Sequence, residues 1–238
     1  MYRIRMRFTK TDRMRFISHL DLMRLMERTL RRADVPLVFS QGFNPHPKIA
    51  FATALSLGIA SEGEYMDIEI EKEIDLQDFK DEMNRALPKG ITILCCKYIA
   101  KTAKALMATV AFSSYIIKCP LEEKLSIESL QNAVKDFMNL REIIHHKITK
   151  KRREAKTKEE NIKSFIKSIE VVEGDELEFI LKVILATGSN GNLKPELLIE
   201  KFKEITKMPI LIDNVRIHRL DLYGIRDDQL ASLLEFTA

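Results

Sequence analysis

The chain has 238 residues, of which 45% are apolar and 31% charged, so it is long enough for two ordinary domains and can bury a core. Its longest apolar runs, such as that near residues 91–96, are too short for a membrane-spanning helix, and the N-terminus lacks the apolar stretch of a secretory signal. Three cysteines supply neither a disulfide framework nor a zinc set, and no CxxxCxxC motif for an iron–sulfur cluster occurs. We therefore expect a cytoplasmic protein with no membrane partner, no metal and no cofactor of its own.

Charge is unevenly spread along the chain, although the formal net charge is only +4. Residues 1–32 carry ten basic against three acidic residues, residues 61–82 two against ten, and residues 141–158 eight against two. Such segregation creates local fields that the net charge hides. Either the first two blocks pair within one domain, or a basic surface is available to a polyanion.

The first hundred residues show the pattern of a β-α-β-β-α-β domain. Residues 2–8 alternate between apolar and arginine side chains, which indicates a half-buried strand. Ser18 is predicted to cap a helix that continues to Ala33 and carries Arg24, Arg28 and Arg31 along one face. The remaining predicted elements are strands at 49–54, 65–71 and 91–99 and a helix at 75–87. This order predicts a ferredoxin-like domain over residues 1–100, with an antiparallel sheet.

The second half is expected to form another α+β domain of the ferredoxin-like type, over residues 106–238. Its predicted elements are strands at 106–118, 143–151, 165–172, 177–186 and 215–223, helices at 126–140 and 195–206, and a short closing helix within 227–238. The strand at 143–151 opens a basic segment that reaches Lys158 and includes Lys150, Lys151, Arg152 and Arg153. That segment is either a solvated loop or a nonspecific phosphate contact.

The alternating arginines of the first strand have a structural explanation. In a ferredoxin-like sheet the first and third strands are antiparallel neighbours, so opposite charges on one sheet face can pair. The residues concerned are Arg3, Arg5 and Arg7 on one strand and Asp67, Glu69 and Glu71 on the other. Pairing is favoured over an RNA-binding sheet face, which would also need aromatic side chains there.

Two segments carry the candidate functional residues. In the first, residues 15–21, His19 could transfer a proton, while Asp21 suits the start of a helix. The second, residues 40–48, combines Gly42 with prolines on both sides of His46 and is expected to be a rigid loop. There Phe43 could stack on a base, Asn44 could read a base edge and Lys48 could hold a phosphate.

These segments, together with residues 55–58 and 61–67, resemble the uncharacterised radical-SAM-linked family. The matching motifs read RFISHLD, RRA, SQGFNPHPK, LSLG and SEGEYMD, at residues 15–21, 31–33, 40–48, 55–58 and 61–67. Members of that family are bacterial domains of unknown function, found free-standing or fused to cobalamin-binding radical SAM proteins. The resemblance implies a radical SAM protein as partner and a role near RNA or the ribosome. It implies no reaction, and no catalytic residue is carried over from it.

Three hypotheses follow from these residues. The first is a non-catalytic module that binds RNA or presents a substrate; its binding residues would be Arg15, Arg31, Arg32, Gln41, Phe43, Asn44, His46 and Lys48. The second is an RNA-processing or RNA-modifying enzyme that uses His19 and His46 as acid and base. The third is a protein–protein adaptor with a basic docking surface. If residues 49–54 form the second strand, the two histidines lie far apart; if residues 37–39 form a strand leading to the loop, they could share a pocket.

Overall fold

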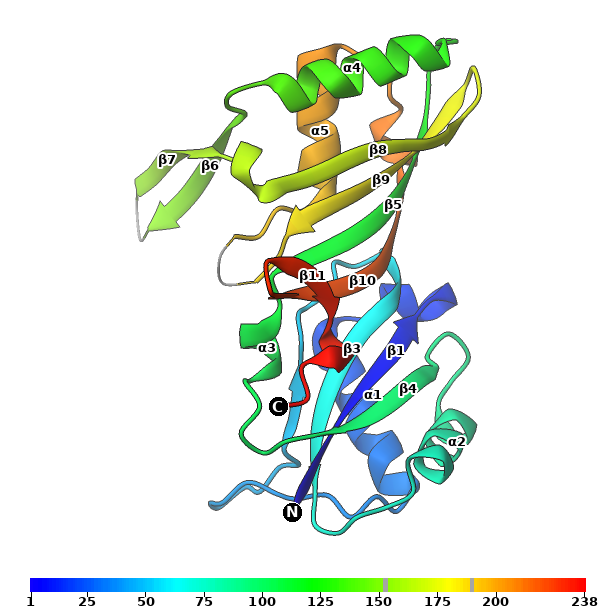
Figure 1. Ribbon diagram of the computed structural model, residues 1–238, viewed down its shortest axis with the longest axis vertical. Helices are drawn as coiled ribbons and strands as arrows, with labels where there is room; N and C mark the ends of the chain where they lie inside the picture. The colour runs from blue at the N-terminus through cyan, green and yellow to red at the C-terminus, as the bar shows by residue number, and fades with distance from the viewer. Residues whose placement is uncertain (152–153, 189–190) are drawn as a thin grey trace. The chain divides into compact units, whose positions relative to one another are not determined.

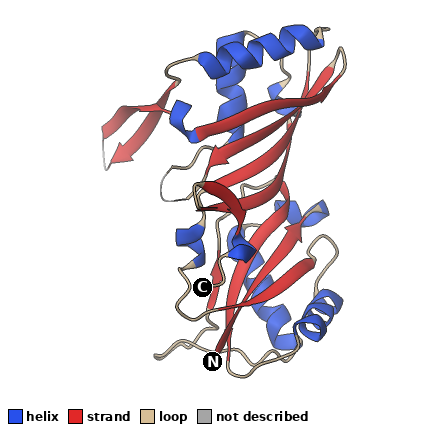
Figure 2. Cartoon of the chain, viewed as in Figure 1, coloured by secondary structure: helices blue, strands red, loops and turns tan. Residues whose placement is uncertain are grey.

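The computed structural model describes residues 1–151, 154–188 and 191–238, and the chain divides into two compact units (Figure 1). Unit 1 comprises residues 1–113 and 218–238, and unit 2 comprises residues 114–217. The described residues form five α-helices and mostly antiparallel strands, so the protein belongs to the α+β class (Figure 2). None of the described helices is both long enough and apolar enough to cross a membrane.

Unit 1 begins with the six elements that the sequence predicts for its first hundred residues. They are β1 (Tyr2–Lys10), α1 (His19–Arg32), β2 (Ile49–Phe51), β3 (Ala60–Ile70), α2 (Leu76–Ala86) and β4 (Ile93–Ile99). β1 lies between β4 and β3, β2 pairs with the other edge of β3, and all these pairs are antiparallel. β2 ends at Phe51, three residues earlier than expected.

One face of this sheet packs against α1 and α2. The alternation of β1 places Ile4, Met6 and Phe8 on that face, where each is fully buried. α1 begins after Ser18, whose hydroxyl accepts a hydrogen bond from the Asp21 amide at 3.1 Å. The helix buries an apolar stripe against the sheet, and its arginines stay on the solvent side.

The charged face of the sheet confirms the predicted pairing for Arg3 and Arg5 with Asp67 only. Glu69 pairs with Lys48 instead, and Glu71 has no ion pair among the described residues. Arg5 is fully buried and binds Asp67 through two nitrogens, at 2.8 and 3.0 Å. Arg3 donates to the same carboxylate at 2.7 Å, and Arg7 pairs with Asp221 at 3.3 Å. These three arginines are neutralised inside unit 1, so they are not available to a nucleic acid.

The C-terminal segment belongs to unit 1, which differs from the expected domain over 106–238. β10 (Arg216–Arg226) pairs in parallel with β3, and β11 (Gln229–Ser232) folds back on β10. The reversal uses Asp227 and Asp228, both with positive φ, as a two-residue hairpin of type I′ requires. The predicted closing helix is therefore a strand and a single 3-10 turn, and Figure 1 shows this red segment beside the blue and cyan strands.

The buried Arg5 side chain holds the C-terminal segment in unit 1. Its third nitrogen donates to the Leu233 carbonyl at 2.8 Å, so the C-terminal segment completes the shell of this buried guanidinium. Gly63 leaves room for β10, because a Cβ there would lie 2.3 Å from the Asp221 Cα. The Tyr65 hydroxyl donates to Asp221 at 2.7 Å and ties the same two strands together.

Unit 2 has its own hydrophobic core. Its elements are β5 (Phe112–Pro120), α4 (Ile127–Asn139), β6 (Ile144–Lys151), β7 (Glu154–Asn161), β8 (Ile166–Gly174), β9 (Glu178–Ala186) and α5 (Pro195–Thr206). β9 lies between β5 and β8, while β6 and β7 form a separate antiparallel hairpin. The predicted basic strand therefore does not join the sheet, and its Arg152 and Arg153 lie outside the described residues. A short helix, α3 (Leu106–Thr109), replaces the start of the strand predicted at 106–118.

Two buried thiols predict how stability depends on alkaline pH. Burial raises the pKa of Cys119 from 9.0 to about 12, with the Glu178 charge adding to the effect, and burial likewise raises the pKa of Cys96 to about 12. Above pH 9 the unfolded chain loses protons that the folded chain keeps. Each thiol should therefore lower the free energy of unfolding by about 1.4 kcal/mol per pH unit once the pH is well above 9.

Chemical denaturation between pH 8 and pH 10.5 measures this slope. Cys119→Ala should flatten the curve relative to the wild type, and the cost of the cavity shifts the whole curve without changing its slope. Parallel curves for the two proteins above pH 9 would contradict the assignment.

Candidate nucleic-acid interface

A short 3-10 helix, η1 (Asp12–Phe16), joins β1 to α1 and presents the first candidate residues. The Gly58 amide donates to the Arg15 carbonyl at 2.9 Å, and the buried Lys10 ammonium donates to the Ile17 carbonyl at 2.9 Å. Burial lowers the pKa of Lys10, and the charge of nearby Glu64 partly offsets this. The C-terminal end of η1 is therefore anchored to the body of unit 1.

The side chains of Arg15 and Phe16 are exposed on this anchored turn. The Arg15 guanidinium carbon lies 4.7 Å from the centre of the Phe16 ring, in a cation–π contact. Phe16 is 61% exposed, which folding alone does not require of a large aromatic residue. The pair forms a flat, cationic surface open to solvent.

The turn after α2 lies directly against η1. The Thr11 amide donates to the Gly90 carbonyl at 2.8 Å. Gly90 has a φ of +97°, and a Cβ there would lie 2.7 Å from the Thr11 carbonyl oxygen, so only glycine fits. This close approach brings Lys89 to the same hollow as Arg13 and Arg15.

Two adjoining hollows share Pro88 and have basic walls. The first, the η1 hollow, has a volume of about 720 Å³ and is lined by Asp12, Arg13, Met14, Arg15, Phe16, Pro88 and Lys89. The second, the α1 hollow, has a volume of about 630 Å³ and is lined by Leu25, Arg28, Arg31, Arg32, Ala86, Leu87 and Pro88. We call their cations the basic face: Arg13, Arg15, Arg28, Arg31, Arg32 and Lys89.

Most of the basic face is not neutralised. Arg31 pairs with Glu27 at 2.7 Å, but the other five cations have no ion pair among the described residues. Arg28 donates to the Arg24 carbonyl at 3.2 Å, and Arg32 donates to the Ala86 carbonyl at 3.0 Å. Carbonyl contacts orient the guanidinium groups and leave their charge in place. All six side chains are exposed, so an anion can reach them.

The loop at 40–48 is closed by a network around His46. The Ser40 amide donates to the His46 carbonyl at 2.8 Å, the His46 amide donates to the Ser40 hydroxyl at 3.1 Å, and that hydroxyl lies 3.0 Å from Nδ1 of the ring. Phe43, between them, is fully exposed, and Gln41 and Asn44 are exposed beside it. The loop thus presents an aromatic ring and two amides to solvent.

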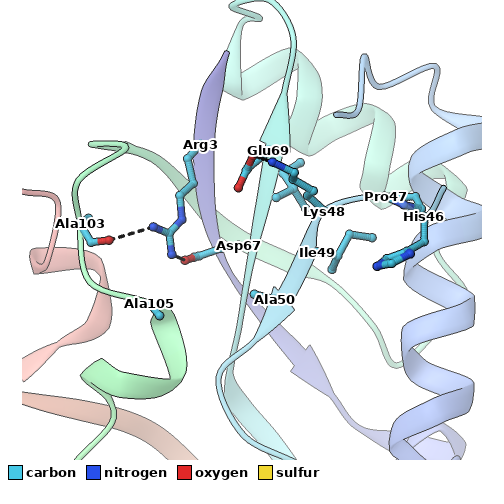
Figure 3. Close-up of a pocket in the computed structure, with 11 residues that line it drawn as sticks. Arg3, His46, Pro47, Lys48, Ile49, Ala50, Asp67, Glu69, Ala103 and Ala105 are labelled. Atoms are coloured by element: carbon cyan, nitrogen blue, oxygen red, sulfur yellow. Dashed lines mark hydrogen bonds and ion pairs between the residues drawn. The ribbon is translucent and has the colours of Figure 1, made fainter. Parts of the chain in front are cut away.

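A third hollow lies beside this loop, with a volume of about 520 Å³ (Figure 3). It is lined by Arg3, His46, Pro47, Lys48, Ile49, Ala50, Asp67, Ile68, Glu69, Ala103 and Ala105. Lys48 pairs with Glu69 at 3.0 Å, and Arg3 pairs with Asp67, so the formal charges of these four residues cancel. Lys48, expected to hold a phosphate, is engaged within the fold.

The structure does not bring His19 and His46 together. β2 begins at Ile49, as in the first topological alternative, so His46 precedes β2, while the His19 ring packs 5.3 Å from the Phe51 ring at its other end. His19 starts α1, whereas Arg31, near the end of α1, lies 5.8 Å from the Phe39 ring beside the loop. A helix of 14 residues is about 20 Å long. His19 and His46 therefore lie near opposite ends of β2 and near opposite ends of α1.

Of the basic face, the sequence alone indicates Arg15, Arg28, Arg31 and Arg32. Arg13 and Lys89 were not singled out, because their meeting depends on the contact between Gly90 and Thr11. The only feature of the sequence that marks Lys89 is its position between a proline and a glycine at the end of a helix.

The family model of DUF2344, described as an uncharacterised protein conserved in bacteria, matches residues 3–195. The chain belongs to this family. Because the DUF2344 description says nothing of radical SAM proteins, that association stays a prediction from the resemblance. A search of the curated proteins returns no match.

Solved structures similar to this DUF2344 member have low sequence identity to it. A chain in the crystal structure of a Cbf5–Nop10–Gar1 complex matches with a TM-score of 0.52 and 10% identity, over 94% of this chain and 50% of that one. A chain in an archaeal box H/ACA sRNP Nop10–Cbf5 complex matches with a TM-score of 0.49 and 10% identity, over 98% and 52%. The present chain spans about half the length of these relatives, and the first match shows a shared fold only.

Proposed function

We propose that this protein binds single-stranded RNA through the basic face and has no catalytic role of its own. The observation that carries the proposal is a set of five exposed cations around two adjoining hollows, none of which has an ion pair with a described acidic residue. Phosphate contacts from Lys and Arg supply most of the affinity of nonspecific nucleic-acid binding. In this proposal the protein presents the bound RNA to a partner enzyme, and the resemblance implies a radical SAM protein in that role.

Exposed aromatic rings favour a single strand over a duplex. Phe16 lines the η1 hollow, and Phe43 lies on the loop that follows Phe39, whose ring contacts Arg31. Bases of single-stranded RNA stack on aromatic rings and on guanidinium planes, whereas the bases of a duplex are already stacked. The combination of cations with accessible rings is therefore suited to an unpaired strand.

The rest of unit 1 limits where RNA can lie. The three arginines of the charged sheet face are held in ion pairs, and the cations of the third hollow are paired with Glu69 and Asp67. The neighbouring helix α2 exposes Asp78, Asp81 and Glu82, which repel phosphate. The favourable path runs along α1 and η1.

Binding of a labelled single-stranded RNA across a salt series tests the proposal. With about five phosphate contacts, log K should fall with log[salt] at a slope of about −3.5, so affinity drops about a hundredfold between 50 and 200 mM salt. A gel of the same mixtures should show intact RNA. A slope near zero, or no binding, would overturn the proposal. Cleavage of the RNA by the protein would instead favour an RNA-processing enzyme.

A further inference from the structure

We infer that the η1 hollow seats one nucleotide of the bound RNA and prefers guanine, with Asp12 reading the base. The inference rests on the proposed function and adds to it a specificity-determining residue. The volume of this hollow, about 720 Å³, falls in the range of small-molecule sites. Its lining combines three kinds of group that a nucleotide needs: a flat surface, cations and a hydrogen-bond acceptor.

The flat surface is the stacked pair of Arg15 and Phe16. The guanidinium lies over the ring at 4.7 Å, so its other side can receive a base. Met14 and Pro88 add apolar walls, and Gly58 stands at the ring edge, where a Cβ would lie 3.9 Å from it. A planar base can therefore be held between the stacked pair and these walls.

The cations for a phosphate are Arg13 and Lys89. Neither has an ion pair among the described residues, and both line the hollow from opposite segments. The turn that carries Lys89 is held against Thr11 by the Gly90 contact. A phosphate between them would be held by two charges whose backbone segments are already fixed, so binding has to order only the two side chains.

Asp12 is the one carboxylate in this cationic hollow. It is exposed and has no hydrogen bond or ion pair from its side chain among the described residues. A carboxylate there weakens phosphate binding, so it needs another partner. Among the RNA bases only guanine presents two adjacent donors, N1–H and the N2 amino group, which match the two acceptor oxygens of a carboxylate. Adenine, cytosine and uracil set an acceptor beside each donor and would face the carboxylate unfavourably.

Four RNA hexamers of otherwise uniform uridine, with G, A, C or U at one central position, test the inference on the full chain. The wild type should bind the G hexamer about tenfold more tightly than the others, as one good bidentate base contact provides. Asp12→Asn should remove this preference and bind the uridine hexamer at least as tightly as the wild type, because a charge that repels phosphate is lost. Asparagine tolerates the left-handed backbone of Asp12, at φ 48°, so the variant changes the charge and not the turn.

Asp34→Asn is the matched control, because Asp34 is also exposed and also has φ 48°, but lies after α1 and outside the η1 hollow. It should keep the guanine preference. With the wild type alone, GMP should displace bound RNA at a lower concentration than AMP, CMP or UMP. Equal affinities for the four hexamers, or a guanine preference that survives Asp12→Asn, would overturn this inference alone. No binding to any hexamer would overturn the proposed function together with it.

Discussion

Reversing two charges of the basic face, in the variant Arg28→Glu/Arg32→Glu, should lower the affinity for single-stranded RNA by about a hundredfold at 0.1 M salt, because two phosphate contacts are lost and two repulsive charges are added. Both side chains line the α1 hollow, are exposed and lack an acidic partner among the described residues. Their loss should therefore leave the fold intact. Fluorescence anisotropy with wild type and variant in the same buffer measures the change.

Lys72→Glu/Lys97→Glu is the matched control for net charge. Both lysines are exposed in unit 1, have no ion pair among the described residues and lie outside the basic face. The net charge changes by the same amount, so only the location differs. This variant should change the affinity severalfold at most. If both double variants lost the same RNA affinity, binding would depend on the net charge of the protein and not on the basic face.

Replacing Asp67 with alanine should lower the free energy of unfolding by about 3–5 kcal/mol, because a buried charge then loses its partner. Arg5 is fully buried and both Arg5 and Arg3 donate to this carboxylate. The guanidinium of Arg5 cannot reach water without opening the C-terminal segment that covers it. Urea unfolding gives the loss directly, and the melting temperature should fall by about 6–20 °C.

Glu69→Ala separates the buried pair from an ordinary surface pair. Glu69 lies two residues further along the same strand and pairs with Lys48, but both side chains are a third or more exposed. The Glu69→Ala substitution should lower the free energy of unfolding by less than about 1 kcal/mol. If the two variants were equally stable, the buried network would not contribute to the fold as described.

Sequence patterns predict the helices and strands correctly where local contacts determine them. The alternation of β1, the Ser18 cap of α1 and the proline at the start of α5 all appear at the predicted places. The pairing of Arg5 with Asp67 followed from the register that adjacent strands must adopt. In each case the information lies within a few residues or within one strand pair.

The parts that sequence reasoning missed depend on contacts between distant segments. β10 pairs with β3 across a long stretch of chain, and no periodicity within residues 215–223 indicates which strand is its neighbour. The position of Lys89 beside Arg13 depends on how closely Gly90 approaches Thr11. The separation of His19 from His46 follows from where β2 begins, which the sequence left open between two alternatives.

Photo-crosslinking of a 4-thiouridine-labelled single-stranded RNA, followed by mass spectrometry of the crosslinked peptides, tests most directly where RNA lies. The account predicts crosslinks in residues 12–16, along the exposed side of α1 and at residues 86–89. Crosslinks confined to the β6–β7 hairpin of unit 2, or to the charged sheet face around Arg3 and Arg7, would contradict it.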